Sequence, residues 1–568
     1  MNQNLSQNLN QDIVVLVILF GVVIVIIGYI LYFAKAEKKA MKNKFLRMWG
    51  KVPEREYEFD EYQSITRYFY NRVKQGVHKE NYIDDITWND LDMDNVYVMM
   101  NHTDSSLGQE YLYDLLRTPV QTKEEAEERE RLIQFFGKNK EVRYALKEIF
   151  LKTGYTRKIS ISDYLEMLGT LPRGTNLPHY LSIVVLLLGI SVLFVAIPIG
   201  VIAVIGAIFC NMALYYKRKG QIEGYVTTFV QILRILEGAD GFDKIKVPEI
   251  SEYVEKIIQA KKQLKKFRKG SFILLFQGGV LSILLDYIRI LFHIDLIKFN
   301  QMLKEVQNHI SEINIVIENM GFIESMIAIA SFRKSLPYHV VPELTEGKKA
   351  YIKIAEASHP MIANPVPNSV TAERGILVTG SNASGKSTFL KTIAINAILA
   401  QTIHTVYARE YQASFFRIYS SMALTDNLKE KDSYYIVEIK SLKRILNHID
   451  EERPVLCFVD EVLRGTNTVE RIAASSRILE SMAQETVICF AATHDIELTY
   501  LLEKMYDNYH FQEKIEENDV LFDYQLVEGR ASSRNAIKLL QIIGYEEEII
   551  KKAEDTASQF LSTGEWRL

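Results

Sequence analysis

The stretch Gly375–Thr388, GILVTGSNASGKST, decides the fold of the C-terminal part of the chain. It reads as a short apolar strand, a glycine-rich turn and the start of a helix, STFLKTIAINAILAQ. The turn has the pattern G-x-x-x-x-G-K-[ST], in which backbone N–H groups curl around phosphates at a helix N-terminus. The sequence therefore predicts a nucleotide-binding loop made of Gly380, Ser381, Asn382, Ala383, Ser384, Gly385, Lys386, Ser387 and Thr388.

Two later apolar runs end in polar residues that suit the same site. The run PVLCFVDE places Asp460 and Glu461 at the end of a strand, and AATHD does the same for His494. An acidic pair at this position suits metal binding by the first carboxylate and polarisation of an attacking water by the second. His494 is placed to sense the γ-phosphate or to orient that water.

These residue types predict a bound nucleotide and Mg²⁺. Lys386 supplies a positive charge to the phosphates, and the Ser387 hydroxyl and Asp460 carboxylate are hard oxygen donors for Mg²⁺. We expect Glu461, His494 and Lys386 to carry the catalytic steps of nucleotide hydrolysis.

The pattern around these motifs divides the chain into two kinds of fold. From about Ala350, short apolar runs alternate with helical stretches, which is typical of a mostly parallel α/β sheet with crossover helices. Residues 84–154 and 221–335 show apolar residues at helical spacing and predict long amphipathic helices. The fold class expected is therefore multidomain, with an all-α region before an α/β nucleotide-binding domain.

The N-terminal run IVVLVILFGVVIVIIGYILYF, residues 13–33, has the length and composition of a transmembrane helix. It is uncharged and about 31 Å long as a helix. A cleaved signal peptide is the alternative, but the preceding residues carry no positive charge. Seven Lys or Arg follow between residues 34 and 51, which predicts that the remainder lies in the cytoplasm and residues 1–12 outside it.

A second apolar block, residues 180–216, contains no charged residue. Pro198 and Gly200 lie near its middle and predict two helices that cross a membrane and return. A pair of buried helices in a soluble domain is the competing interpretation. With residues 13–33, this hairpin gives three predicted transmembrane helices in a multi-pass protein of the cell membrane.

Two other stretches leave alternatives open. Residues 271–299 are largely apolar, but Asp286, Arg289 and Asp295 interrupt them, which favours a core helix over a membrane span. Six basic residues lie between Lys261 and Lys269, where they suit either phosphate contacts or an ordinary solvated helix face.

Composition sets looser limits on function. The chain has 568 residues, a formal net charge of −4 and a pI of about 6.3, so no global basic field indicates nucleic acid as a partner. Its three cysteines, Cys210, Cys457 and Cys489, have no metal-binding spacing and are typical of a reducing compartment.

The motifs resemble those of the MutS family, the ABC-type ATPases of DNA mismatch repair. The similar segments are TGSNASGKSTFLKT, VDEVLRGTNT and AATHDIELT, together with SHPMIANPVPNSV at residues 358–370. Residues 522–555 are similar to the helical dimerisation tail of the family, and residues 96–136 to the start of its core and lever region.

The resemblance implies a homodimer with ATP bound between subunits. Ser433 stands where the family has a serine that reaches the γ-phosphate in the partner subunit, although Tyr434 replaces the usual threonine. The family's N-terminal mismatch-recognition domain has no counterpart here, and a transmembrane helix and linker are expected in its place. Recognition of mismatches is therefore in doubt.

Three functions follow as alternatives. The first is a membrane-anchored ATPase that binds mismatched or branched DNA, and the second is an ATP-driven membrane mechanoenzyme acting on a lipid, protein or envelope partner. A nucleotide-binding scaffold without hydrolysis is a third, which intact Lys386, Asp460 and Glu461 argue against.

The domains expected are residues 1–12 outside, 13–33 transmembrane, 34–85 linker, 86–179 first lever part, 180–216 hairpin, 217–345 second lever part, 346–520 ATPase and 521–568 helical tail.

Overall fold

The computed structural model describes residues 20–563 apart from several gaps. These gaps are residues 22–24, 26–27, 30–31, 34, 37–38, 41, 44, 79–80, 157, 272–279, 382–383, 423–433, 451, 464–465, 517–518, 532–536, 538–539 and 541–543. The predicted helix at residues 13–33 falls mostly outside the described residues, and its membrane assignment stays a prediction.

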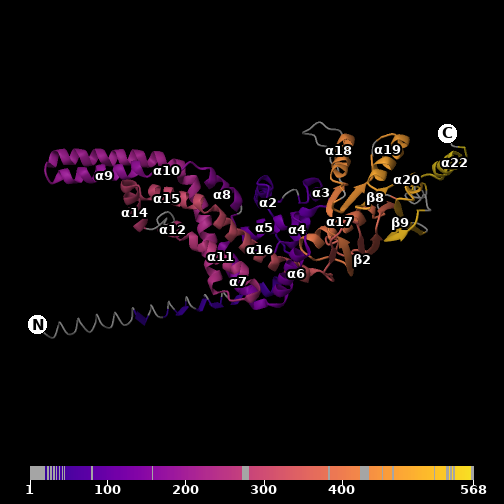
Figure 1. The fold of residues 1–568 in the computed structure, drawn as a ribbon, viewed down its shortest axis with the longest axis horizontal. Coiled ribbons are helices and arrows are strands. Elements are labelled where there is room, and N and C mark those ends of the chain that lie inside the picture. The colour runs from indigo at the N-terminus through magenta and orange to yellow at the C-terminus, as the bar shows by residue number, and fades with distance from the viewer. Residues whose placement is uncertain are drawn as a thin grey trace.

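The described residues confirm a helical N-terminal region followed by an α/β region (Figure 1). The helical region runs from residue 59 to residue 335, with α16 packed against α5, α6 and α11 near its centre. Its helices are α2 (Phe59–Lys74), α3 (Asp85–Asp90), α4 (Met93–Met100), α5 (Ser106–Arg117), α6 (Lys123–Lys138), α7 (Lys140–Thr153), α8 (Ile161–Thr170), α9 (Leu177–Leu193), α10 (Ile197–Gly241), α11 (Ser251–Gln263), α12 (Lys265–Arg268), α14 (Val280–Phe292), α15 (Ile294–Asn308) and α16 (Ile310–Ser335), with short 3₁₀ turns at Phe242–Lys244 and Pro248–Ile250.

The α/β region contains two sheets. The smaller has the order β1-β5-β2-β3, and the larger has the order β10-β9-β4-β8-β7-β6. In the larger sheet β9, β4, β8, β7 and β6 are parallel, and β10 pairs with β9 in the antiparallel direction. The strands are β1 (Glu343–Thr345), β2 (Ile352–Ala357), β3 (Asn368–Ala372), β4 (Gly375–Thr379), β5 (Glu410–Ser414), β6 (Arg417–Ser421), β7 (Val455–Asp460), β8 (Val487–Thr493), β9 (Tyr506–Glu516) and β10 (Asp519–Glu528).

Helices connect the strands of the larger sheet. They are α17 (Lys386–Thr402), α18 (Tyr434–Asn447), α19 (Thr468–Ser481) and α20 (Ile496–Leu501), and the C-terminal α22 (Glu547–Thr563) follows the last strand. Strands β4 and β8 are buried along their whole length, as expected for central parallel strands covered on both faces. One apolar core extends without interruption from α2 through α16 to α17 and β9, so the two regions share a packed interface.

Helices α9 and α10 project from the helical region as a paired hairpin (Figure 1). The chain turns at residues 194–196, and Pro198 stands in the first turn of α10, where its missing N–H costs no hydrogen bond. Gly200 is needed at the turn because a Cβ there would lie 2.5 Å from the backbone N of Leu193. The helix pair is present, with the break slightly earlier than Pro198, and its insertion in a membrane stays a prediction.

Apolar side chains on the hairpin face outward. In the part of the chain that the structure describes, two helices are long and apolar enough to span a membrane: Ile197–Gly220, with 17% of its most apolar window buried, and Ile310–Ser335, with 72% buried. The second is the central helix α16. Helix α9 is shorter but exposes a similar surface, including Leu181, Val185 and Leu188.

Two expected elements differ from the structure, and a third boundary is not marked by a helix end. Helix α10 continues through the basic residues 217–219 into the helical region without a break, and the membrane boundary expected there stays a prediction. The expected core helix at 271–299 is interrupted at His293, which has a φ of 50° and separates α14 from α15. The expected helical tail begins too early, because residues 519–528 form β10 of the larger sheet.

The basic residues 261–269 are only partly available to a ligand. Lys261 is buried and its Nζ lies 2.7 Å from Asp243 Oδ2 and 3.2 Å from Asp240 Oδ1, while Arg268 pairs with Asp240 at 2.6 Å. Lys262, Lys265, Lys266 and Lys269 are exposed. Asp240 of α10 and Asp243 of the following 3₁₀ turn therefore neutralise two of the six positive charges.

Candidate functional site

Parallel strands bring the three sequence motifs together. Strand β8 lies between β4 and β7, so the C-terminal ends of all three strands meet at one edge of the sheet. The glycine-rich loop follows β4, Asp460 ends β7, and His494 follows β8. Ligand sites of open α/β sheets form at this edge.

The glycine-rich loop turns sharply into α17. Gly380 and Gly385 have φ angles of 151° and 104°, which L side chains rarely adopt. A Cβ on Gly380 would also lie 2.8 Å from Ser384 Oγ. Lys386 Nζ donates to the carbonyl oxygens of Gly380, at 2.9 Å, and Ser381, at 2.8 Å, so the ammonium group lies against its own loop.

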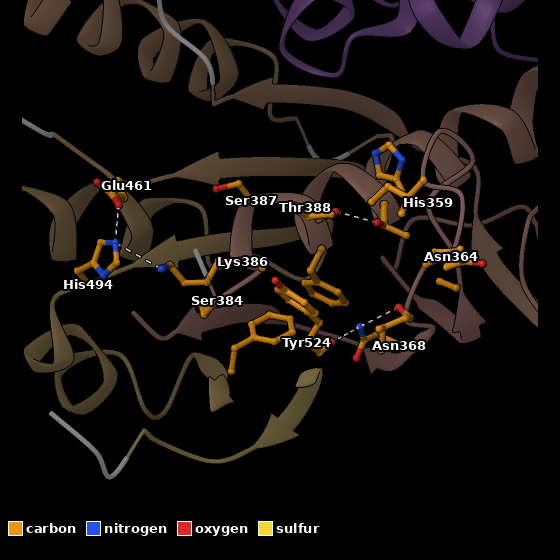
Figure 2. Close-up of a pocket in the computed structure, with 18 residues that line it drawn as sticks. His359, Asn364, Asn368, Ser384, Lys386, Ser387, Thr388, Glu461, His494 and Tyr524 are labelled. Carbon is orange, nitrogen blue, oxygen red and sulfur yellow. Dashed lines mark hydrogen bonds and ion pairs between the residues drawn. The ribbon is translucent and has the colours of Figure 1, made fainter. Parts of the chain in front are cut away.

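The polar groups of the three strand ends contact one another directly. Ser387 Oγ donates to Asp460 Oδ2 at 2.5 Å. His494 Nε2 lies 2.7 Å from Glu461 Oε1 and 3.3 Å from Lys386 Nζ (Figure 2). Glu461 is held in a left-handed conformation, with φ of 58°, and its N–H donates to Ala492 O at 2.9 Å. A strained residue of this kind is common at functional sites.

A cavity of about 480 Å³ opens beside these groups. Lys386, Ser387, Glu461 and His494 line its polar end (Figure 2). Its other walls are formed by residues for which the sequence predicted no individual role, although most lie in the segments that resemble MutS, among them His359, Ile362, Pro365, Val366, Asn368, Phe389, Phe511 and Tyr524. A cavity that is charged at one end and apolar at the other matches a nucleotide, which has phosphates at one end and a flat base at the other.

Tyr524 enters the cavity from the last strand of the sheet. It has a φ of 55° at an irregularity in the β9–β10 pairing, and a Cβ on Gly385 would lie 3.1 Å from its ring. Asn368 fixes this segment, because its Nδ2 donates to Tyr524 O at 3.0 Å and its Oδ1 accepts from Leu526 N–H at 2.7 Å. The left-handed backbone at Tyr524 directs its ring into the cavity, and no pattern in the sequence predicts this backbone conformation.

His359 is a neutral group on the cavity wall. Burial, with a smaller contribution from the positive charge of Lys391, lowers the pKa of His359 to about 4. The side chain is therefore uncharged near neutral pH and adds no positive charge that would attract phosphate.

The oxygen donors fit Mg²⁺ only in combination with a ligand. Ser387 Oγ and Asp460 Oδ2 are in contact and are hard donors of the kind that Mg²⁺ prefers. Among the residues that the structure describes, no group of three or more His, Cys, Asp or Glu side chains is arranged to hold a metal. An ion here would take its remaining oxygens from phosphate and water, which is usual for Mg²⁺ in phosphate sites.

Most of the predicted site residues are thus brought together. Gly380, Ser381, Ser384, Gly385, Lys386, Ser387, Thr388, Asp460, Glu461 and His494 all lie in or beside the cavity. Asn382, Ala383 and Ser433 lie outside the described residues, and their roles stay predictions.

Comparison with known proteins shows what this region is similar to. Residues 376–561 match the family MutS domain V. The chain is 31% identical over 222 residues to the DNA mismatch repair protein MutS of Thermus thermophilus, which is 38% of this chain and 27% of that protein. It is 30% identical over 289 residues to that of Leptospira interrogans, with 48% and 33% covered, and 28% identical over 272 residues to that of Methanosarcina barkeri, with 45% and 30% covered.

These matches relate the C-terminal half of the chain to the MutS family. The matched segments span about a third of the length of these relatives or less. The comparisons therefore bear on the cavity and its surroundings, and not on the apolar hairpin.

Proposed function

We propose that the chain is a MutS-related P-loop ATPase of the ABC type that binds and hydrolyses ATP in this cavity. The observation that supports this best is the meeting of Lys386, Ser387, Asp460, Glu461 and His494 at the end of three parallel strands. The match of residues 376–561 to MutS domain V supports it independently.

In this proposal each polar residue has one task. The loop N–H groups and Lys386 bind the phosphates, for which Lys386 leaves its contacts with the carbonyls of residues 380 and 381. Ser387 and Asp460 would hold Mg²⁺, which neutralises charge that develops on the phosphates. Glu461 accepts a proton from the attacking water. His494, whose Nε2 lies 2.7 Å from the Glu461 carboxylate, keeps that carboxylate oriented.

The apolar end of the cavity would bind the base, with Tyr524 as its exposed aromatic wall. Replacing Tyr524 with alanine is expected to weaken ATP binding by about 5–150-fold, since stacking of a base on an aromatic side chain contributes about 1–3 kcal/mol. Tyr524→Phe keeps the ring and is expected to bind as the unmodified chain does. Equal affinities of Tyr524→Ala and Tyr524→Phe, measured with a fluorescent ATP analogue, would show that the base lies elsewhere.

ATP would be shared between two copies of the chain. By resemblance to MutS, Ser433 would lie against the γ-phosphate of the partner subunit, and the described helix of the tail, α22, is amphipathic, as a dimerisation helix needs to be. We therefore propose a homodimer that closes when ATP is bound.

DNA is the first candidate partner. The relatives are named as DNA mismatch repair proteins, and four exposed lysines between residues 262 and 269 are available for phosphate contacts. Binding through phosphate contacts weakens steeply as salt is raised.

A bilayer-embedded partner is the second candidate, because of the hairpin. Its outward-facing apolar residues suit lipid, and α10 runs without interruption from the hairpin into the helical region. ATP-driven closure would then move helices inside a membrane. In both cases we propose a multi-pass protein of the cell membrane with its ATPase region in the cytoplasm.

One experiment tests the ATPase and separates the partners. The purified chain is assayed for ATP turnover with homoduplex, mismatched and branched DNA at about 50 mM and 200 mM salt. Non-specific binding of DNA should be stronger at about 50 mM. Stimulation by DNA that declines with salt would support the first candidate. If DNA neither changes ATP turnover nor is retained by the chain at the lower salt, DNA is excluded as the partner. Absence of Mg-dependent turnover would contradict the ATPase activity itself.

A further inference from the structure

The C-terminal end of α17 is attached to the helical region by three hydrogen bonds. The last carbonyls of a helix have no partner within the helix and need one from outside. Here Val120 N–H donates to Gln401 O at 2.8 Å, and Arg129 Nη1 donates to Thr402 O. Arg333 Nη2 donates to His404 O at 2.9 Å, just beyond the helix. The helix that begins at the phosphate loop therefore ends in contact with α6 and α16.

Arg333 and Glu130 form the most constrained of these attachments. Both are buried, with 8% and 9% of their surfaces exposed. Arg333 Nη1 lies 2.8 Å from Glu130 Oε1 and Nη2 lies 2.6 Å from Oε2, so the pair is bidentate. Arg333 Nε also donates to Thr405 Oγ1 at 2.9 Å. A planar guanidinium that has hydrogen-bond partners on two edges fixes both the distance between the groups it joins and their relative orientation.

Glu130 remains ionised in this environment. Burial alone raises the pKa of a carboxyl group, but hydrogen bonds from Arg333 and His404 and the charge of Arg333 outweigh it and lower the pKa of Glu130 to about 2. Gln134 Nε2 adds a further hydrogen bond to Oε1 at 2.8 Å. The ion pair is therefore intact throughout the neutral range.

The segment that precedes α2 contacts the same turn of α16. Gly50 N–H donates to Ser331 Oγ at 3.1 Å, and a Cβ on Gly50 would lie 2.6 Å from Lys334 Cγ. At its other end, α16 follows α15, which begins at the root of the hairpin, where Tyr215 donates to Asp295 Oδ2 at 2.7 Å. Helix α16 thus lies between the hairpin side of the molecule and α17 (Figure 1).

We propose that Arg333 and Glu130 are positioning residues that transmit the position of α17 to α16, so that ATP at one end of α17 sets the orientation of the helical region. This proposal rests on the nucleotide site proposed above. Helix α17 is buried along most of its length, and packed interiors transmit small displacements because they compress little. A shift at Lys386 therefore reaches Thr402 and its arginine partners.

A surface ion pair on the same helix offers a matched control. Lys391, in the middle of α17, lies 2.9 Å from Asp92 Oδ2 of the helical region, but the Asp92 side chain is 54% exposed. Solvent-exposed pairs of this kind contribute little and constrain little. Lys391→Met removes a charged contact between the same two regions without touching the Arg333–Glu130 pair.

The test measures a distance between the two regions in the full chain. In a Cys210→Ser background, spin labels are placed at Ile315→Cys on α16 and Val469→Cys on α19, both exposed positions. Labelled chains are diluted with unlabelled chains so that only distances within one chain are measured. Double electron–electron resonance is recorded without nucleotide, with MgADP and with a non-hydrolysable ATP analogue, and nucleotide binding is measured on the same samples.

We expect the ATP analogue to shift the distance in the unmodified chain and in Lys391→Met. The shift is expected to be lost in Glu130→Gln and Arg333→Lys although both variants still bind nucleotide, and to be reduced in Thr405→Val, a milder change that preserves volume. A shift that persists in the folded Glu130→Gln and Arg333→Lys variants, or is absent from the nucleotide-bound unmodified chain, would overturn the proposal. Failure of the unmodified chain to bind nucleotide would instead refute the ATP site.

Discussion

Replacing Glu461 with glutamine is expected to slow ATP hydrolysis by about 10²–10⁴-fold while MgATP still binds. Glutamine keeps the size of the side chain but cannot accept the proton of the attacking water. The contacts of Lys386, Ser387 and Asp460 are unaffected, so the phosphates keep their partners. Single-turnover hydrolysis and binding of labelled ATP measure the two effects separately.

The same variant reports on the dimer. With hydrolysis blocked, ATP should hold two copies together, which light scattering detects as a doubled mass in the presence of MgATP. Glu497→Gln, an exposed position just beyond β8, serves as the control and should hydrolyse ATP normally. Normal turnover by Glu461→Gln would remove Glu461 from the role of base.

Cys210 is expected to be shielded from a membrane-impermeant maleimide when the chain is reconstituted in vesicles. It is the exposed cysteine of the three and lies in the apolar part of α10, whereas Cys457 and Cys489 are buried. Lipid around the hairpin would exclude the aqueous reagent. Replacing Val185, Leu188 and Ile202 with lysine should restore labelling, since each charge inside a bilayer costs about 3 kcal/mol.

A control for this labelling lies outside the hairpin. Ser251→Cys, at an exposed position of α11, should react in both the unmodified hairpin and the lysine variant. Replacing the same three hairpin residues with alanine keeps the surface apolar and should leave Cys210 shielded. If Cys210 reacts in intact vesicles as fast as residue 251, the hairpin lies in water and the proposed membrane function loses its basis.

The sequence predicted the polar half of the cavity because the C-terminal ends of neighbouring parallel strands lie together. Motifs that end neighbouring parallel strands meet at one edge, so the places of Lys386, Asp460 and His494 followed from the order of apolar runs. The apolar half did not follow. Phe511 and Tyr524 come from β9 and β10, and the ring of Tyr524 reaches the cavity through a left-handed backbone that no local pattern indicated.

The helix boundaries show what charge and apolar patterns do not specify. The basic residues 217–219 predict the end of a membrane segment but not the end of a helix, because lysine and arginine are good helix formers and α10 continues past them to Gly241. In contrast, the apolar run at 271–299 gave no sign of a break at His293, because that residue adopts a positive φ without being glycine. Composition located the apolar surfaces well and the ends of helices less well.

Binding of MgATP to the purified full chain tests the central claim most directly. Isothermal titration with a Glu461→Gln background, to prevent turnover, is predicted to show saturable binding of one nucleotide per chain. Lys386→Met should weaken it by about 30-fold or more, since removing one partner of a buried charge contact costs about 2–5 kcal/mol, while Lys391→Met should leave it unchanged. Absence of saturable binding, or equal affinity of Lys386→Met and Lys391→Met, would contradict the account.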